Sequence, residues 1–436
     1  MAVEPIEEIR IAGFKSLAKE TRLAVRPLTI LAGANSSGKS SAMQPLLLLK
    51  QTLASPVDPG VLNIAGPNVQ FTEYDQLFSR VSGRKQSVRT MKFGFSTQHE
   101  SFDHYYRLEH RELSLEKAEY LIQGHGLPAQ FVLRSGKLSE AEEEALPENL
   151  RYACQQLTNL GPGNRFIQAV ASRGFLGLAV VFPDIERSTA FSFYSEGREN
   201  PLNLIHIPGL RGSPQRDYHL WSTKGPRFDG HFQEYVAGII ASWKTGKQAA
   251  VLGDALRELG LTWTVQAQAL DATRVEIQVG RLKSPKRGGA KDLVSIADVG
   301  FGVSQVLPAL VAMQVAEPGQ LVYLEQPEIH LHPKAQRNLA KLLADGARRG
   351  ARLMVETHSS ILLRGIQTLV AKGELDPKLI KLHWFSRDEQ SGETTVTSAD
   401  LDENGAFGAD WPEDFDDTYL ASERDYLDAV ETRERR

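Results

Sequence analysis

The sequence contains almost no cysteine: Cys154 is the one thiol among 436 residues. A single cysteine cannot form an intramolecular disulfide or a cysteine metal cluster, which fits a protein kept in a reducing compartment. Long apolar runs are missing too, since the longest, Val306–Met313, is interrupted by Pro308 and is far shorter than the roughly 18 residues that cross a bilayer. The first residues also lack the apolar core of a signal peptide. We therefore expect a cytoplasmic protein with no membrane-spanning segment.

The chain also lacks a strong charge of either sign. Its net charge is −4, and 41% hydrophobic with 24% charged residues is close to an ordinary globular composition. Overall charge therefore does not attract nucleic acid, and any contact with DNA must come from a local patch. The length favours two or three domains, and neither a solenoid repeat nor a sustained heptad pattern is present.

What the sequence does contain is a complete phosphate-binding motif near its start. Residues 33–40 read GANSSGKS, a full match to G-x-x-x-x-G-K-[ST], between the apolar run Leu28–Ala32 and a helical segment. The glycines let backbone N–H groups face a phosphate, the lysine reaches the β- and γ-phosphates, and the serine hydroxyl ligates Mg²⁺. We predict ATP and Mg²⁺ as cofactors. The residues expected to bind them here are Gly33, Ala34, Asn35, Ser36, Ser37, Gly38, Lys39, Ser40 and Ser41.

Two apolar runs in the second half of the chain complete this predicted site. Residues 321–328, LVYLEQPE, read as a buried strand that delivers Glu325 beside the P-loop, where it would hold Mg²⁺ together with Ser40. Residues 352–359, RLMVETHS, read as another strand, whose terminal histidine would sense the γ-phosphate or orient water. The candidate catalytic residues are Glu325, Gln326, Glu328 and His358.

A second anion-binding geometry is predicted where residues 299–305, VGFGVSQ, lead into a helix that runs on to Ala316. Small residues and a hydroxyl at a helix start suit a phosphate. Because one P-loop already covers one face of a nucleotide, we expect Gly302, Ser304 and Gln305 to meet the nucleotide of another subunit. The alternative is that Ser304 simply caps the helix.

The order of these patterns predicts an α/β fold formed by both chain ends, with a segment of different character between them. Alternating aromatic residues from Val88 to Ile122 indicate antiparallel strands, and Ser139 is a plausible helix cap. The expected division is an N-terminal lobe with the P-loop at 1–85, a mixed β/α insertion at 86–230, a C-terminal lobe at 231–380 and an acidic tail at 381–436.

Taken together, these residues resemble the ATP-binding-cassette (ABC) class of P-loop ATPases, in the branch that includes SMC, RecF and OLD-type proteins. Gly13-Phe14-Lys15-Ser16 resembles the first strand of SMC-like heads. The phrases GANSSGKSS, GFGVSQVLP, EQPEIHLHP and ETHS look like a group of bacterial predicted AAA/ABC-type ATPases that is often linked to anti-phage defence, as do residues 207–218 and 402–412. The resemblance implies an ABC-type ATPase head with a signature, a Walker B strand and a His switch.

The resemblance also implies a function. We expect a homodimer or higher oligomer that closes on ATP and acts as a switch for a separate effector protein, in phage defence. The alternative is a RecF-like DNA clamp in DNA repair, so DNA stays open as a partner. Without heptads there is no SMC coiled coil, and the residues beyond Leu382 are too few for the OLD nuclease domain. ABC heads carry two carboxylates where this chain has Glu325-Gln326, which implies slow hydrolysis.

Other polar residues leave alternatives open. His330 and His332 lack a third metal ligand, and the resemblance puts them in a loop that crosses the dimer interface. Arg211 and Arg216 are candidates for a γ-phosphate contact, an interdomain clasp or a nucleic-acid contact, or they are ordinary surface arginines. The basic loop Lys283–Lys291 would touch phosphate backbone or be merely solvated.

Overall fold

The structure is a computed structural model, and it describes residues 3–80, 88–123, 129–158, 165–183, 187–191, 202–221, 228–243, 246–282, 292–408, 424 and 427–428. The basic loop Lys283–Lys291 lies outside the described residues, as does most of the acidic tail beyond Gly408. Of the helices that the structure describes, none is long and apolar enough to cross a membrane.

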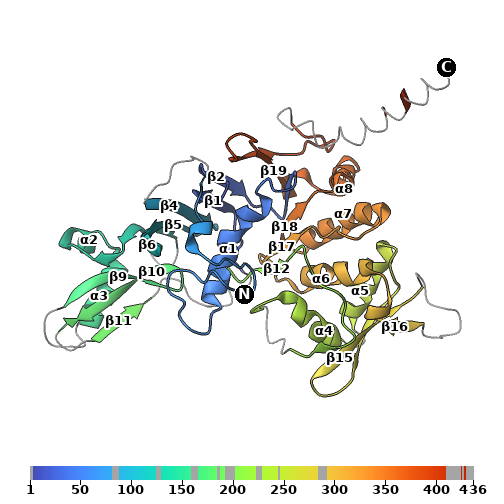
Figure 1. The fold of residues 1–436 in the computed structure, drawn as a ribbon, viewed down its shortest axis with the longest axis horizontal. Helices are drawn as coiled ribbons and strands as arrows, with labels where there is room; N and C mark the ends of the chain where they lie inside the picture. Colours follow the sequence, from blue (N-terminus) through green and yellow to red (C-terminus); the bar gives the residue numbers. More distant parts are fainter. Residues whose placement is uncertain are drawn as a thin grey trace.

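One six-stranded sheet joins the two ends of the chain (Figure 1). Neighbouring strands are parallel except at the β20 edge, where the last pair is antiparallel. In spatial order the strands are β12 (Ile205–Ile207), β17 (Leu321–Glu325), β18 (Arg352–Thr357), β3 (Leu28–Gly33), β19 (Ile380–Arg387) and β20 (Thr394–Ala399). The α/β fold class and its construction from both chain ends are therefore confirmed.

Both faces of this sheet are buried, which explains why its strands are nearly continuous apolar runs. In β3, Leu28 and Ile30 belong to one core cluster and Leu31 to another. The first cluster contains the helices α4 (Phe232–Trp243), α5 (Lys247–Glu258), α6 (Phe301–Val315), α7 (Pro333–Arg348) and α8 (Ser360–Ala371). The second contains α1 (Lys39–Leu53) and the strands of an antiparallel region.

The antiparallel region starts from a second six-stranded sheet, in the order β2-β1-β4-β5-β6-β7. Its strands are β1 (Glu8–Ala12), β2 (Thr21–Ala24), β4 (Val88–Ser96), β5 (Glu100–Glu109), β6 (Glu112–Ile122) and β7 (Ala129–Arg134). A four-stranded sheet packs beside it, formed by β8 (Gly136–Lys137), β9 (Phe166–Ser172), β10 (Phe175–Phe182) and β11 (Arg187–Phe191). The antiparallel strands expected between Val88 and Ile122 are confirmed.

A smaller sheet covers the far side of the helical cluster. It contains β13 (Tyr218–His219), β14 (Val265–Ala269), β15 (Arg274–Gly280) and β16 (Leu293–Ser295). The 3₁₀ turn Ile296–Asp298 then leads into α6. The segment that follows β12 in the sequence thus returns to pack against the helices of the parallel sheet.

Three local features differ from the simplest expectation. Ser139 caps a helix as predicted, but the helical stretch is split by Pro147 into α2 (Glu140–Glu144) and α3 (Glu148–Thr158). β4 pairs with β1, and β12 pairs with β17, so strand pairing crosses the segment limits at 85 and 230. The hairpin of β19 and β20 completes the parallel sheet within the region expected to begin the acidic tail.

Candidate functional site

The P-loop lies between β3 and α1, as its sequence predicts, and two of its glycines are sterically required. Gly33 has φ 142° and Gly38 has φ 103°, both in the region that favours glycine. A Cβ at Gly33 would lie 2.2 Å from the carbonyl oxygen of Phe385, and one at Gly38 would lie 2.7 Å from Thr394 Oγ1. The β19–β20 hairpin therefore presses directly against the loop.

Lys39 is buried at the base of this loop. Its Nζ donates to the carbonyl oxygens of Gly33 at 3.0 Å and Ala34 at 2.6 Å, and it lies 3.3 Å from Ser37 Oγ. Burial lowers the pKa of Lys39, and the nearby Glu356 carboxylate opposes that shift. The ammonium group is thus held where the loop curls, in the position expected of a phosphate-binding lysine.

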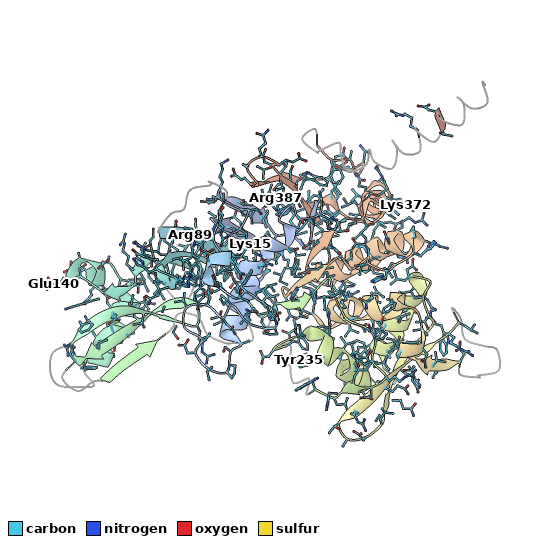
Figure 2. All side chains as sticks on the ribbon, in the orientation of Figure 1. Lys15, Arg89, Glu140, Tyr235, Lys372 and Arg387 are labelled. Atoms are coloured by element: carbon cyan, nitrogen blue, oxygen red, sulfur yellow. The ribbon has the colours of Figure 1, made fainter. Side chains whose placement is uncertain are left out.

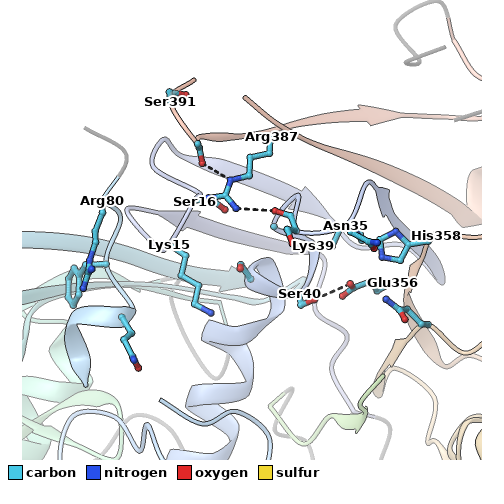
Figure 3. Close-up of a pocket in the computed structure, with 17 residues that line it drawn as sticks. Lys15, Ser16, Asn35, Lys39, Ser40, Arg80, Glu356, His358, Arg387 and Ser391 are labelled. Atoms are coloured by element: carbon cyan, nitrogen blue, oxygen red, sulfur yellow. Dashed lines mark hydrogen bonds between the residues drawn. The ribbon is translucent and has the colours of Figure 1, made fainter. Parts of the chain in front are cut away.

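A cavity of about 870 Å³ opens over the P-loop (Figure 3). Of the residues predicted from the sequence, those that line it are Asn35, Ser36, Gly38, Lys39, Ser40, Ser41, Gln326 and His358. The lining also contains four basic side chains, Lys15, Lys39, Arg80 and Arg387, against one carboxylate, Glu356. This surplus of positive charge suits a polyanionic ligand.

Several lining residues were not predicted as parts of the site. They are Lys15, Ser16, Gln76, Phe78, Arg80, Glu356, Arg387, Ser391 and Gly392. Lys15 and Ser16 belong to the GFKS phrase that resembles SMC-like heads, and Glu356 precedes Thr357-His358, so these three carried a usable signal. Figure 2 shows Lys15 and Arg387, from opposite ends of the chain, near the middle of the molecule. Nothing local to Arg387 could have predicted that placement.

The carboxylate beside the P-loop serine is Glu356 rather than the predicted Glu325. Ser40 Oγ donates to Glu356 Oε1 at 2.9 Å, and Tyr323 Oη donates to Glu356 Oε2 at 2.8 Å. Burial is the main reason that the pKa of Glu356 is raised, and the Glu325 charge adds to it. Two hard oxygen donors are thus already adjacent, and this donor set fits Mg²⁺.

Glu325 lies behind this position and does not line the cavity. Its Oε1 is 2.9 Å from His206 Nε2, and its Oε2 accepts from the Gly209 N–H at 3.0 Å. Burial alone would raise the pKa of Glu325, but these hydrogen bonds stabilise the charged form and leave its pKa below the usual value. Its role as a metal ligand therefore stays a prediction.

The remaining candidate catalytic residues divide between the cavity and the interior. Gln326 and His358 line the cavity, and burial together with the Lys39 charge lowers the pKa of His358. Glu328 is 6% exposed and lies outside the cavity lining. Its Oε1 accepts from Thr357 Oγ1 at 2.6 Å and from the His358 N–H at 3.2 Å, and burial raises its pKa. Glu328 thus supports the strand end that carries His358.

The start of α6 lies away from this cavity, since none of Gly302, Ser304 and Gln305 lines it. The alternative that Ser304 caps α6 is wrong: the helix begins at Phe301, and Ser304 Oγ donates to the Phe301 carbonyl at 3.0 Å within the first turn. Gln305 Nε2 instead donates to the Gly212 carbonyl at 2.9 Å. A contact between these residues and the nucleotide of another subunit stays a prediction.

The other polar candidates separate clearly. His332 is the N-cap of α7, and the ring of His330 lies 5.9 Å from that of Phe301. Among the residues that the structure describes, no group of three or more His, Cys, Asp or Glu is placed to bind a metal. Arg211 is only 9% exposed, so it is not a surface arginine, whereas the Arg216 side chain is 71% exposed and pairs with Asp298.

Comparison with known proteins gives one family match. Residues 269–364 match the family described as "AAA domain, putative AbiEii toxin, Type IV TA system". The matched segment includes Glu325, Gln326, Glu328 and His358, and it excludes the P-loop. The match shows that this part of the chain is similar to an AAA domain. No curated protein matches the chain.

Three solved structures with a similar fold are SMC heads. The SmcHead bound to the C-winged helix domain of ScpA is 12% identical, covers 92% of this chain and 98% of its own, and has a TM-score of 0.47. The SMC head domain from Thermotoga maritima is 10% identical, covers 90% and 98%, and has a TM-score of 0.38. The Smc head with an extended coiled coil, bound to a ScpA domain derived from Pyrococcus furiosus, is 13% identical, covers 91% and 96%, and has a TM-score of 0.43.

Proposed function

We propose that the chain is a Mg²⁺-dependent enzyme that binds and hydrolyses ATP. The observation that carries this proposal is the P-loop with its buried Lys39 at the base of a large cavity lined by basic side chains. Backbone N–H groups of the loop and the start of α1 would hold the β-phosphate, and Lys39 would neutralise charge on the β- and γ-phosphates. The family match to an AAA domain supports the same ligand class.

The residues next to Lys39 fit a divalent cation. Ser40 and Glu356 would hold Mg²⁺, with Glu325 behind them as the carboxylate predicted from the sequence. The ion would supply charge neutralisation on the phosphate oxygens. Gln326 and His358 line the same cavity and would orient the attacking water. Because the Gln326 amide cannot take up a proton, we expect slow turnover.

At the level of the whole protein, we propose an ATP-dependent switch. Two heads would pair through ATP, with Gly302, Ser304 and Gln305 of one chain facing the nucleotide of another, and hydrolysis would reopen the pair. A separate effector protein would read the closed state. The link to phage defence rests on the resemblance of the GANSSGKSS and EQPEIHLHP phrases to defence-linked ATPases.

Nucleotide titration tests the first level of this proposal. We expect a fluorescent ATP analogue to bind in the presence of Mg²⁺, phosphate to be released slowly, and light scattering to show an ATP-dependent rise in mass. The variant Ser304→Arg should keep single-chain binding and lose the rise in mass. Absence of nucleotide binding by the wild type would refute the enzyme assignment. Binding without any change in mass would refute the pairing of two chains but not the enzyme assignment.

A RecF-like DNA clamp is the second candidate. Part of its sequence support, the basic loop Lys283–Lys291, lies outside the described residues. DNA-stimulated hydrolysis with a steep salt dependence would favour the clamp. Hydrolysis that ignores DNA, together with co-purification of one neighbouring gene product, would favour the effector switch.

A further inference from the structure

We propose that Arg211 is a positioning residue that couples the start of α6 to the turn after the acidic strand. The inference rests on the proposed ATPase function, because that turn carries Gln326 into the nucleotide cavity. Arg211 itself does not line that cavity. It would act by fixing the relative position of two backbone segments, one at the end of β17 and one in the first turns of α6.

The guanidinium group of Arg211 reaches both segments at once. Its Nη2 donates to the carbonyl oxygens of Glu325 at 2.5 Å and Gln326 at 3.2 Å, and its Nη1 donates to the Gln305 carbonyl at 3.0 Å. The planar fork of an arginine can span three carbonyl groups in this way, whereas the single ammonium of a lysine cannot reproduce the geometry. Burial lowers the pKa of Arg211 to about 10, so the group remains charged at neutral pH.

The turn that Arg211 holds is strained. Gln326 has φ 44°, a left-handed conformation that is unfavourable for a residue with a side chain. Its N–H donates to the Glu356 carbonyl at 2.8 Å, and its own carbonyl accepts from Arg211. The same carbonyl accepts from the Ile329 N–H at 3.1 Å, so contacts on both sides hold Gln326 in this conformation.

The first turns of α6, at the other end of the contact, lack one backbone hydrogen bond of a regular helix. Pro308 lies inside α6 and cannot donate the backbone hydrogen bond that the Ser304 carbonyl would normally accept. Arg211 binds the next carbonyl along, that of Gln305. The Gln305 side chain returns a hydrogen bond to the Gly212 carbonyl at 2.9 Å. Residues 211–212 and the first turns of α6 are therefore joined by two hydrogen bonds, one donated from each side.

The same segment also holds the Glu325 side chain. His206 of β12 lies 2.9 Å from Oε1, with its ring stacked on Tyr323 at a centroid distance of 5.2 Å, and the Gly209 N–H binds Oε2. Tyr323 then bonds to Glu356, which bonds to Ser40. Residues 206–212 thus contact the acidic strand through both side chain and backbone, and the contacts continue to the P-loop serine.

Hydrogen–deuterium exchange on the full chain tests the coupling directly. We compare Arg211→Lys with Arg216→Lys, a matched change in the same segment at an exposed ion pair. In Arg211→Lys, amides of 326–331 and of 301–307 should both exchange about tenfold faster without nucleotide. With ATP and Mg²⁺, the wild type and Arg216→Lys should show altered exchange at 301–307, and Arg211→Lys should show none.

Kinetics provides the second readout, because a positioning role separates binding from turnover. We expect Arg211→Lys to lower kcat about tenfold while the affinity for a fluorescent ATP analogue stays within about twofold. Identical nucleotide responses at 301–307 in Arg211→Lys and the wild type would overturn the coupling. A wild type that shows no nucleotide-induced change even at the P-loop would instead contradict the proposed function.

A second variant keeps the test decisive if Arg211→Lys does not fold. Gln305→Ala removes the hydrogen bond to the Gly212 carbonyl, from the opposite side of the contact, and shortens a buried side chain. It should raise exchange at 326–331 about threefold, although residue 305 lies in a different element. Where both variants fold, their effects on kcat should be less than additive. Unchanged exchange at 326–331 in Gln305→Ala, or full additivity, would refute the coupling.

Discussion

The candidate site has two halves that are built in opposite ways. The phosphate half consists of eight consecutive residues, 33–40, from the end of one strand to the first turn of one helix. The acidic half is gathered from β12 and the residues after it, from β17 and from β18, which are more than 100 residues apart at their extremes. In the first half the backbone conformation decides the function. In the second half, the order of strands that are distant in the sequence decides which carboxylate faces the P-loop.

The register of the parallel sheet explains why the acidic half is ambiguous. Glu325 and Glu356 are direct partners on β17 and β18, so both carboxylates leave the sheet at the same level. β18 is the neighbour of β3, whereas β17 is one strand further away. Ser40 lies in the first turn of the helix after β3 and is therefore closer to Glu356 than to Glu325. Strand order, rather than motif identity, selects the carboxylate that a metal would find beside the serine.

The largest expected effect tests the phosphate half. Lys39→Ala removes the buried ammonium group, and loss of a hydrogen-bonded charge facing two phosphates should weaken ATP binding roughly 100-fold. Lys372→Ala, at an exposed lysine after α8, is the control and should bind normally. Equilibrium titration with a fluorescent ATP analogue measures both. Equal affinities would show that the loop is not a phosphate site.

The next effect tests the acidic half. Glu356→Gln should raise the Mg²⁺ concentration needed for half-maximal nucleotide binding about 30-fold, since disturbing a metal's supporting carboxylate commonly costs 10- to 100-fold. Glu325→Gln should have a smaller effect on Mg²⁺, because its carboxylate contacts His206 and Gly209 instead of Ser40. Magnesium titrations of the two variants decide between them. The reverse order would restore Glu325 as the metal ligand that the sequence predicts.

These two halves also show what could be predicted from the sequence. The α/β class, the main strands and helices and all of the P-loop follow from local patterns, because hydrophobic period and glycine spacing act over a few residues. The β19–β20 hairpin is not predicted from the sequence. Its role in the site comes from the pairing of β19 with β3, which the hairpin's own sequence does not show. For the same reason, the sequence does not decide whether Arg211 is a γ-phosphate contact, an interdomain clasp, a nucleic-acid contact or a surface arginine. Its burial depends on Gln305 and Glu325, each about 100 residues away.

Gln326→Glu tests whether the missing general base limits the rate of ATP hydrolysis. A carboxylate at this cavity position would supply the base that an amide cannot, and a positioned general base contributes about 100-fold or more in favourable cases. We expect a rise in kcat of only about tenfold, because the left-handed backbone at residue 326 does not place a carboxylate in the best position for a general base. Steady-state phosphate release measures it. Fast wild-type turnover that is lost in Glu328→Gln, without gain in Gln326→Glu, would move the base to Glu328.

The smallest effect tests whether even the contiguous half depends on remote support. Thr394 begins β20, is 3% exposed, and its Oγ1 lies 2.8 Å from both Ser16 Oγ and the Ser37 carbonyl. A hydroxyl has one proton, so Thr394 donates to the carbonyl and accepts from Ser16. These bonds hold the P-loop at Ser37, directly before the Gly38 turn, where Thr394 also fills the space a Cβ would need.

Thr394→Val keeps the shape of the side chain and removes both hydrogen bonds, which are worth about 0.5–1.5 kcal/mol each. Because part of that loss falls on overall stability, we expect ATP affinity to fall about fivefold. Thr394→Ser restores the hydroxyl and should bind within twofold of the wild type, as should Thr395→Val at the exposed neighbouring position. Equal affinity in Thr394→Val and Thr394→Ser would mean that the hairpin supports the loop by packing alone. A fivefold difference in ATP affinity between these two variants would show that the Thr394 hydroxyl, more than 350 residues from Ser37, supports phosphate binding.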